Sequence, residues 1–215
     1  MWIFFTGYKR LRDNERKIMN FLVNKIVCAI GCVAKDNNSK LNAKHIAFAA
    51  MAVALAVVTS MIKVIKLPMG GSVTLFSMLF IVLIGYWYGI KTGLTAALAY
   101  GVLQLLLDPY ILNIPQVLLD YILGFGALGL SGIFSNSKHG LIKGYIVGVI
   151  GRFICSFLSG WIFFAVYTPE FFNSAILYSI VYNGSYIGLE AAVTLVVISL
   201  PPVNKALAYV KNNLV

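Results

Sequence analysis

From residue 44 onward the chain is a succession of long apolar runs separated by loops of only a few residues. A helix that crosses the hydrocarbon layer of a bilayer needs about 20 mostly apolar residues. The whole chain is 60% hydrophobic and 11% charged, against about 25% charged in a typical soluble domain. We therefore predict an all-α integral membrane protein, a bundle of six transmembrane helices. These span about residues 44–66, 72–90, 92–107, 115–134, 140–167 and 174–200.

Proline residues support several of these boundaries. Asp108-Pro109 stops the third predicted helix, Pro115 suits the first turn of the fourth, and Pro201-Pro202 ends the sixth.

The boundaries predict three parts of the chain. A basic N-terminal arm, 1–43, is interpreted as an amphipathic helix on the membrane surface. The membrane domain covers 44–203, and a cytoplasmic tail covers 204–215.

Basic residues are distributed unevenly along the chain, whose net charge is +10. Nine of the 17 Lys and Arg lie in residues 1–44. The loops predicted on the same side, with the tail, add Lys91, Lys138, Lys143, Lys205 and Lys211, and the opposite loops hold Lys63 and Lys66. The basic side of a membrane protein faces the cytoplasm. We therefore expect both termini in the cytoplasm of a multi-pass bacterial plasma-membrane protein. We expect the arm near anionic lipid headgroups rather than nucleic acid.

The sequence offers no pattern typical of an enzyme or a metal site. Cys28, Cys32 and Cys155 lack the spacing of metal ligands. His45 and His139 lie in or beside cytoplasmic loops, and we find neither a Ser/His/Asp set nor a phosphate-binding glycine loop. We therefore predict no catalytic residues, no metal and no cofactor. Energy for any transport must then come from a partner or an ion gradient.

Three ionisable residues fall inside predicted membrane helices, where a charge is costly and usually functional. They are Asp120 in the outer part of the fourth helix, Arg152 in the fifth and Glu190 in the sixth. A lone charge at this depth needs a partner or a wet cavity. The sequence leaves open whether Arg152 forms an ion pair with Asp120 or Glu190 that only stabilises the bundle.

Asp120 has a polar and aromatic neighbourhood. Gln116 precedes it by one helical turn on the same face, and Tyr121 adjoins it. Further candidates lie in the preceding loop (Tyr110), in the fifth helix (Phe164) and in the sixth (Tyr178, Asn183). A carboxylate, amides and rings on one face suit a flat, cationic, heteroaromatic ligand. The first outer loop, with Gly70, Gly71 and Ser72, predicts a mobile lid, a backbone cradle or a simple turn.

Small residues recur at every fourth position in several predicted helices, as in Gly93, Ala97 and Gly101. Such stripes let helix backbones approach closely in lipid, so they predict internal seams. The first helix differs because it carries alanines almost all round, including Ala50 and Ala54. This smooth face predicts either an internal seam or a docking surface for a removable partner.

Three stretches resemble the ThiT family, the thiamine-specific substrate-capture (S) components of energy-coupling factor (ECF) transporters. They are Gly70-Gly71-Ser72-Val73, the run from Gln116 through Asp120-Tyr121 to Phe134, and Tyr178 to Asn183-Gly184. The resemblance covers about residues 44–200. It implies a six-helix fold, a site near the outer face, and partners comprising a membrane coupling protein and two cytoplasmic ATPases. It also implies that the alanines of the first helix dock the coupling protein.

The resemblance places the family's binding positions on Tyr100, Tyr110, Asp120, Tyr121, Ser156, Phe164, Tyr178 and Asn183. Asp120 stands where the family usually has Glu, and Ser156 stands where His can occur. Phe164 and Tyr100 stand where Trp can occur. The binding positions as a group keep their acidic, aromatic and amide character despite these differences from the family.

The sequence therefore predicts a high-affinity thiamine-binding subunit of an ATP-driven vitamin uptake transporter, without enzymatic activity of its own. Two alternatives stay open. One is an S component for another vitamin or for a thiamine precursor such as an aminopyrimidine. The other, from a different class, is a membrane enzyme or assembly protein that uses Asp120, Arg152 and Glu190; no second group for proton transfer can be identified.

Overall fold

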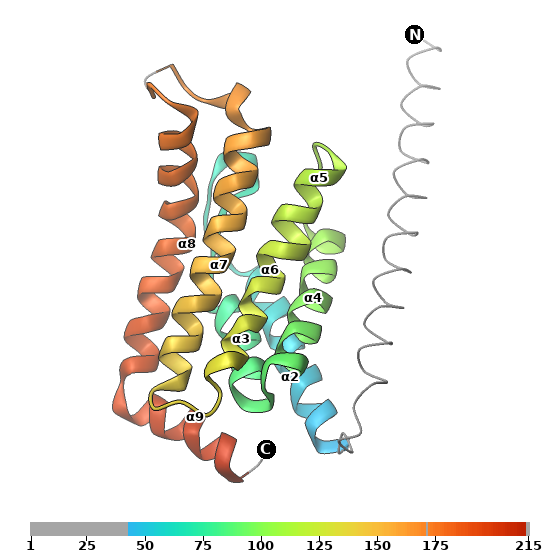
Figure 1. Cartoon of the computed structure of the whole chain (residues 1–215), viewed down its shortest axis with the longest axis vertical. Helices are drawn as coiled ribbons and strands as arrows, with labels where there is room; N and C mark the ends of the chain where they lie inside the picture. The colour runs from blue at the N-terminus through green and yellow to red at the C-terminus, as the bar shows by residue number, and fades with distance from the viewer. Residues whose placement is uncertain (1–42, 171, 214–215) are drawn as a thin grey trace. The chain divides into compact units, whose positions relative to one another are not determined.

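The computed structural model describes residues 43–170 and 172–213. Residues 1–42, which hold nearly all of the predicted basic arm together with Cys28 and Cys32, lie outside the described residues. The described part is predominantly helical, and its helices stand side by side (Figure 1). They are α2 (Ala43–Met61), α3 (Ser77–Tyr88), α4 (Ile90–Leu107), a helical run over 114–134, α7 (Gly140–Phe163), α8 (Ala175–Ser199) and α9 (Pro201–Asn213).

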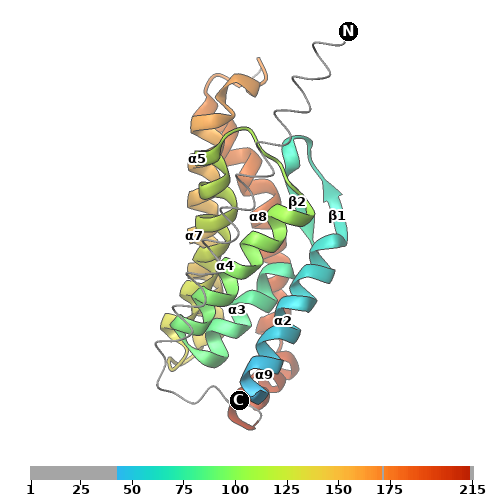
Figure 2. The same cartoon turned by 90° about the vertical axis from the view of Figure 1, so that its right-hand side faces the viewer.

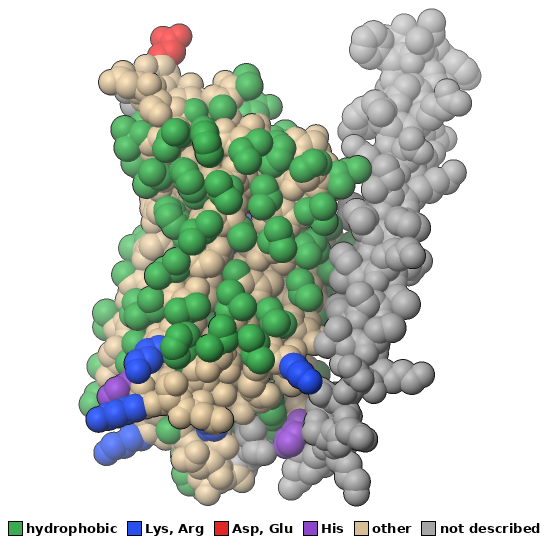
Figure 3. All heavy atoms as spheres, viewed as in Figure 1, with side chains coloured by type: hydrophobic (Ala, Val, Ile, Leu, Met, Phe, Trp, Pro, Cys, Tyr) green, Lys and Arg blue, Asp and Glu red, His purple; other side chains and the backbone are tan. Residues whose placement is uncertain are grey.

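Four of these segments are long and apolar enough to cross a membrane: α4, the 114–134 run, α7 and α8. The apolar helices α2 and α3 are shorter. Large aliphatic side chains cover the outside of the bundle, with Val196 66% exposed and Leu123 54% exposed. Figure 3 shows this apolar surface along the helices, with Lys and Arg gathered at one end. Outward-facing apolar side chains are what lipid-solvated helices require.

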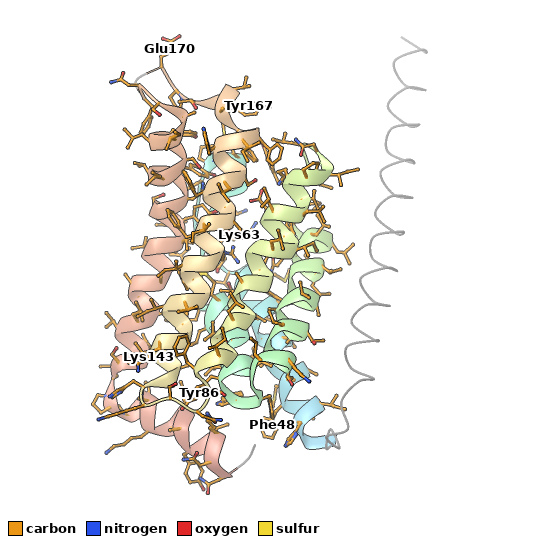
Figure 4. The ribbon with its side chains drawn as sticks, in the orientation of Figure 1. Phe48, Lys63, Tyr86, Lys143, Tyr167 and Glu170 are labelled. Atoms are coloured by element: carbon orange, nitrogen blue, oxygen red, sulfur yellow. The ribbon has the colours of Figure 1, made fainter. Side chains whose placement is uncertain are left out.

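The two ends of the bundle differ in side-chain chemistry. Figure 4 places Lys143, Tyr86 and Phe48 toward one end, and Tyr167 and Glu170 at the other. Helix α9 also lies at the basic end, as Figure 1 shows. There Lys211 donates a hydrogen bond to the Ser135 carbonyl and lies 4.2 Å from the Tyr86 ring centroid. Pro201-Pro202 ends α8 as predicted and also begins α9, which contains most of the predicted tail.

The 114–134 run changes helix type along its length. It passes from α5 (Ile114–Val117) through the π-helix η2 (Leu118–Leu123) and α6 (Gly124–Gly126) to the 3-10 helix η3 (Ala127–Phe134). Asn113 caps its start by accepting a hydrogen bond from the Gln116 backbone N–H at 2.9 Å. The narrow η3 contacts α3, α4 and α7. A Cβ added at Gly132 would lie 2.3 Å from the Ile90 nitrogen, so glycine is required at this seam.

The loop between the first two helices corrects the all-α prediction. Helices were expected to reach residue 66 and to resume at 72, but α2 ends at Met61 and α3 begins at Ser77. Between them β1 (Lys63–Lys66) pairs antiparallel with β2 (Ser72–Thr74) across the short helix η1 (Pro68–Gly70), as Figure 2 shows. The β-branched pair Val64-Ile65 favours a strand, and Gly70 supplies a turn with φ +91°.

The Glu190 carboxylate on α8 holds the junction between this hairpin and α3. Its Oε2 accepts hydrogen bonds from the Thr74 backbone N–H at 3.1 Å and from the Thr74 hydroxyl at 2.7 Å. Its Oε1 accepts from the Ser77 hydroxyl and the Met78 N–H, each at 3.3 Å. The residue before α3, Phe76, makes no side-chain cap. Glu190 therefore caps the α3 N-terminus from another helix.

Removing this cap should destabilise the protein. Glu190 is only 5% exposed, and Glu190→Ala leaves buried N–H and hydroxyl groups without an acceptor. Each hydrogen bond to a charged group contributes about 1.5–3 kcal/mol. We expect a clearly lower thermal unfolding midpoint in detergent. Glu170→Ala, at an exposed position in the loop between α7 and α8, is the matched control and should unfold like the unmodified protein. Equal midpoints for the two variants would contradict the capping role.

Candidate ligand-binding cavity

One cavity brings together side chains from the hairpin, α4, the 108–121 region, α7 and α8. All twelve predicted binding residues line it, although they come from segments far apart in the sequence. They are Gly70, Gly71, Ser72, Tyr100, Tyr110, Gln116, Asp120, Tyr121, Ser156, Phe164, Tyr178 and Asn183. The fold thus places the predicted residues around one space. Which of them contact a ligand stays a prediction.

Asp120 lies in the π-helix η2 and is held on one side only. Its Oδ2 accepts a hydrogen bond from Gln116 Nε2 at 2.7 Å and from the Ser159 hydroxyl at 2.8 Å. Gln116 and Ser159 are 1% and 0% exposed. Within the described residues, Oδ1 accepts no hydrogen bond, and Asp120 is a half-buried residue that lines the cavity. One carboxylate oxygen is therefore fixed, and the other can accept a hydrogen bond from a molecule in the cavity.

Tyr121 ties the same turn to the preceding loop. Its hydroxyl donates to the Asp108 carbonyl at 2.9 Å and accepts from the Tyr110 N–H at 2.8 Å. Gln116 adds a bond from Nε2 to the Tyr110 carbonyl at 3.2 Å. These bonds satisfy backbone groups that the break between α4 and α5 leaves without helical partners. The loop that carries Tyr110 is thereby fixed beside the cavity.

Aromatic rings form two walls of the cavity. Tyr110 stacks on Phe164, with ring centroids 5.7 Å apart and planes 26° apart. On α8, Tyr178, Tyr182 and Tyr186 follow one another at successive turns, with centroid separations of 5.7 and 5.8 Å. Aromatic faces attract cations and stack on planar rings. The walls therefore suit a flat ligand that carries positive charge.

The hairpin lines the cavity and is held in place by hydrogen bonds and an ion pair. The Gly71 N–H donates to the Tyr182 hydroxyl at 3.0 Å, and that hydroxyl donates to the Pro68 carbonyl. Lys63 on β1 forms an ion pair with Asp108 at the end of α4. A Cβ added at Gly71 would lie 2.6 Å from the Tyr182 oxygen. Glycine at this position lets the hairpin backbone approach α8 closely.

Asn183 and Arg152 differ in how many of their side-chain polar atoms have hydrogen-bond partners. Asn183 donates from Nδ2 to the Ser179 carbonyl at 3.0 Å and accepts from the Tyr186 hydroxyl at 2.9 Å. The Arg152 guanidinium lies over the Phe125 ring, 3.8 Å from its centroid. Its buried Nε and Nη1 have no hydrogen-bond partner. In the described part of the chain, no ion pair joins Arg152 to Asp120 or Glu190, which answers the question that the sequence left open.

The sequence analysis did not assign Arg152, Ser159 and Tyr186 to the binding site, and Tyr182 was considered only as one of the aromatic residues near Asp120. Helical spacing could have found them. Arg152 and Ser159 lie four residues before and three after Ser156, on one face of α7. Tyr182 and Tyr186 repeat the position of Tyr178 at four-residue intervals. Glu190 also lines the cavity, but its oxygens are occupied by the hairpin–α3 junction.

The fold and cavity define a class of protein. Membrane-length helices and a hairpin line a site that has aromatic walls and a carboxylate with hydrogen bonds to one oxygen only. This combination is typical of a membrane-embedded binding protein for a small, polar aromatic molecule.

Comparison with known proteins identifies the family. The family model for thiamine transporter proteins (Thia_YuaJ) matches residues 46–209. The chain is 32% identical over 167 residues to the thiamine transporter ThiT of Bacillus subtilis (strain 168), covering 70% of this chain and 85% of that protein. The structure of ThiT from Listeria monocytogenes has the same fold, with a TM-score of 0.60, 24% identity and coverage of 74% of this chain and 94% of that chain. The chain therefore belongs to the thiamine transporter protein family.

The hairpin contacts lead to a prediction about its mobility. In Tyr182→Phe the hydroxyl that joins the Gly71 N–H to the Pro68 carbonyl is lost. We expect faster amide hydrogen exchange over residues 67–72. The matched control is Tyr178→Phe, because that hydroxyl contacts only the Met69 sulfur, at 3.8 Å. If both variants exchange at the rate of the unmodified protein, Tyr182 does not fasten the hairpin.

Proposed function

We propose that this chain is the thiamine-binding S component of an ECF-type, ATP-driven uptake transporter. It would bind thiamine from outside the cell with high affinity and perform no chemistry of its own. Family membership supports thiamine transport. The composition of the cavity supports binding by the residues described above.

The geometry of Asp120 is the observation on which the ligand assignment depends. Asp120 lines the cavity, two side chains fix its Oδ2, and its Oδ1 accepts no hydrogen bond from the described residues. Thiamine offers an amino group on its pyrimidine ring, which can donate a hydrogen bond, and a positively charged thiazolium ring. Charge-assisted bonds of this kind are about twice as strong as neutral ones. The tyrosine and phenylalanine walls would stack on the two rings.

Arg152 suggests how the ligand is oriented. It lies seven residues before Ser159 on α7, about 10 Å further from the outer end of that helix. A guanidinium repels thiazolium but can donate to ring nitrogens. We therefore place the cationic ring toward Tyr110 and Phe164, and the hydrogen-bond acceptors of the ligand toward Arg152. The same unpaired donors also suit a neutral aminopyrimidine precursor, which is the second candidate ligand.

Orientation and partners complete the proposal. The basic end would face the cytoplasm, with both chain termini inside, six apolar helices spanning the bilayer and the hairpin outside. A membrane coupling protein would contact α2, where Ala50 and Ala54 are both exposed. Two cytoplasmic ATPases would supply the energy, since the sequence carries no nucleotide-binding motif of its own.

Asp120→Asn tests the ligand assignment. Losing one charge-assisted hydrogen bond costs about 1.5–3 kcal/mol, so thiamine affinity should fall about ten- to a hundred-fold. The thermal unfolding midpoint of the empty protein should change little, because Gln116 and Ser159 can still contact the amide. Glu170→Gln controls for the loss of a carboxylate at an exposed position. Unaltered affinity in folded Asp120→Asn protein would remove Asp120 from the site.

Ala50→Trp tests the partner surface. A bulky ring on the exposed face of α2 blocks close helix approach, so uptake in cells should be lost while thiamine binding by the purified chain is kept. Val196→Trp, at an exposed position on α8, is the matched control and should support uptake. Normal uptake by Ala50→Trp would show that this face of α2 is not used for docking.

A further inference from the structure

The π-helix η2 contains both Asp120 and Tyr121, which line the cavity. In η2 the Gly124 N–H donates to the Leu119 carbonyl, five residues back, instead of four as in an α-helix. A turn with an additional residue is wider than an α-helical turn and pushes its backbone outward. Such turns inside α-helices are rare and occur often at functional sites. They persist only where the surrounding structure holds them.

On one side the wide turn presses against α4. A Cβ added at Gly101 would lie 2.2 Å from the Tyr121 carbonyl oxygen and 3.2 Å from Phe125 Cβ. No real Cβ contact to a backbone oxygen is as short as the first of these distances. Even an alanine at 101 must therefore displace η2, α4 or both. Gly101 leaves the space that the π-turn occupies.

On the other side of η2, a residue of α7 forms a hydrogen bond with the Asp120 side chain. The Ser159 hydroxyl, fully buried, donates to Asp120 Oδ2 at 2.8 Å. The neighbouring Tyr121 directs its hydroxyl to the Asp108–Tyr110 loop instead. Two consecutive residues thus make contacts with different elements. Asp120 lines the cavity, with Oδ2 held by Gln116 and Ser159 and no hydrogen bond to Oδ1 from the described residues.

We propose that the π-turn is the element that directs the Asp120 carboxylate toward the ligand, and that Gly101 and Ser159 are the positioning residues that hold it. This inference rests on the proposed function, because it assigns Asp120 to ligand binding. It goes beyond that function by assigning roles to a backbone irregularity and to two residues that need not touch the ligand.

Equilibrium thiamine binding to single and double variants tests the positioning role. Ser159→Ala should lower affinity about three- to ten-fold, the effect of one lost hydrogen bond. Gly101→Ala should lower it at least as much, because the whole turn must move. In an Asp120→Ala background there is no carboxylate to direct. Each substitution should then change the remaining affinity by less than about twofold.

Matched controls separate positioning from general loss of stability. Ser131→Ala removes another fully buried hydroxyl, which donates to the Val82 carbonyl at 3.0 Å away from the cavity. Gly144→Ala introduces a Cβ 2.8 Å from the Ser131 carbonyl at the seam between α7 and η3. Both controls should lower the thermal unfolding midpoint and leave thiamine affinity unchanged.

The outcomes distinguish the two proposals. Failure of the unmodified chain to bind thiamine would reject the proposed function. Normal binding by the unmodified chain, with equal losses from Ser159→Ala in both backgrounds, would reject the positioning role alone. If the Gly101→Ala variant does not fold, comparing Ser159→Ala in the unmodified and Asp120→Ala backgrounds still tests the positioning role. Unchanged affinity in folded Ser159→Ala or folded Gly101→Ala protein would remove that residue from the proposal.

Discussion

Lipid cannot hydrogen-bond, and the structure depends on this constraint. Every polar group within the bilayer must be satisfied by protein or must face a wet cavity. Most backbone groups are satisfied within helices, while the outward side chains are aliphatic. Glu190 uses both carboxylate oxygens on the start of α3 and on β2. In the described part of the chain, Asp120 Oδ1 and two nitrogens of Arg152 lack hydrogen-bond partners, and both residues line the cavity described above. The buried Tyr145 hydroxyl also lacks a partner there, at a position that does not line this cavity.

Polar groups without hydrogen-bond partners at this depth lower the stability of the empty protein. They also increase the free energy that is gained when a ligand binds to them. A ligand that forms hydrogen bonds with both Asp120 and Arg152 satisfies groups whose bonds are stronger in the low-dielectric interior of the bundle than in water. The supports of Asp120 are fixed before binding, because Gln116 and Ser159 are buried and bonded. Little conformational entropy is then lost when the ligand arrives. The hairpin, fastened by Tyr182, is the part of the wall built from strands rather than membrane helices.

Apolar run length and proline positions were enough to predict the helical segments and most of their ends. The pairing of Gln116 with Asp120 also followed from helical spacing, and the hydrogen bond confirms it. Three features could not be predicted. The hairpin at 63–74 depends on pairing between two short segments. The π-turn depends on contact with Gly101 on another helix. The roles of Glu190 and Arg152 depend on which helices lie next to each other. A charged residue within a predicted membrane helix can cap another helix, as Glu190 does, or can stay without an ion-pair partner, as Arg152 does in the described residues, and the sequence does not distinguish the two cases.

The most direct test is equilibrium binding of thiamine to the purified chain in detergent, without partner proteins. The proposed ligand site predicts saturable binding at one site per chain. It also predicts competition by the aminopyrimidine half of the molecule, which carries the donor for Asp120, and weaker competition by the thiazolium half. Absence of saturable thiamine binding by folded protein would contradict the account. Binding of the aminopyrimidine more tightly than thiamine would instead identify the precursor as the ligand.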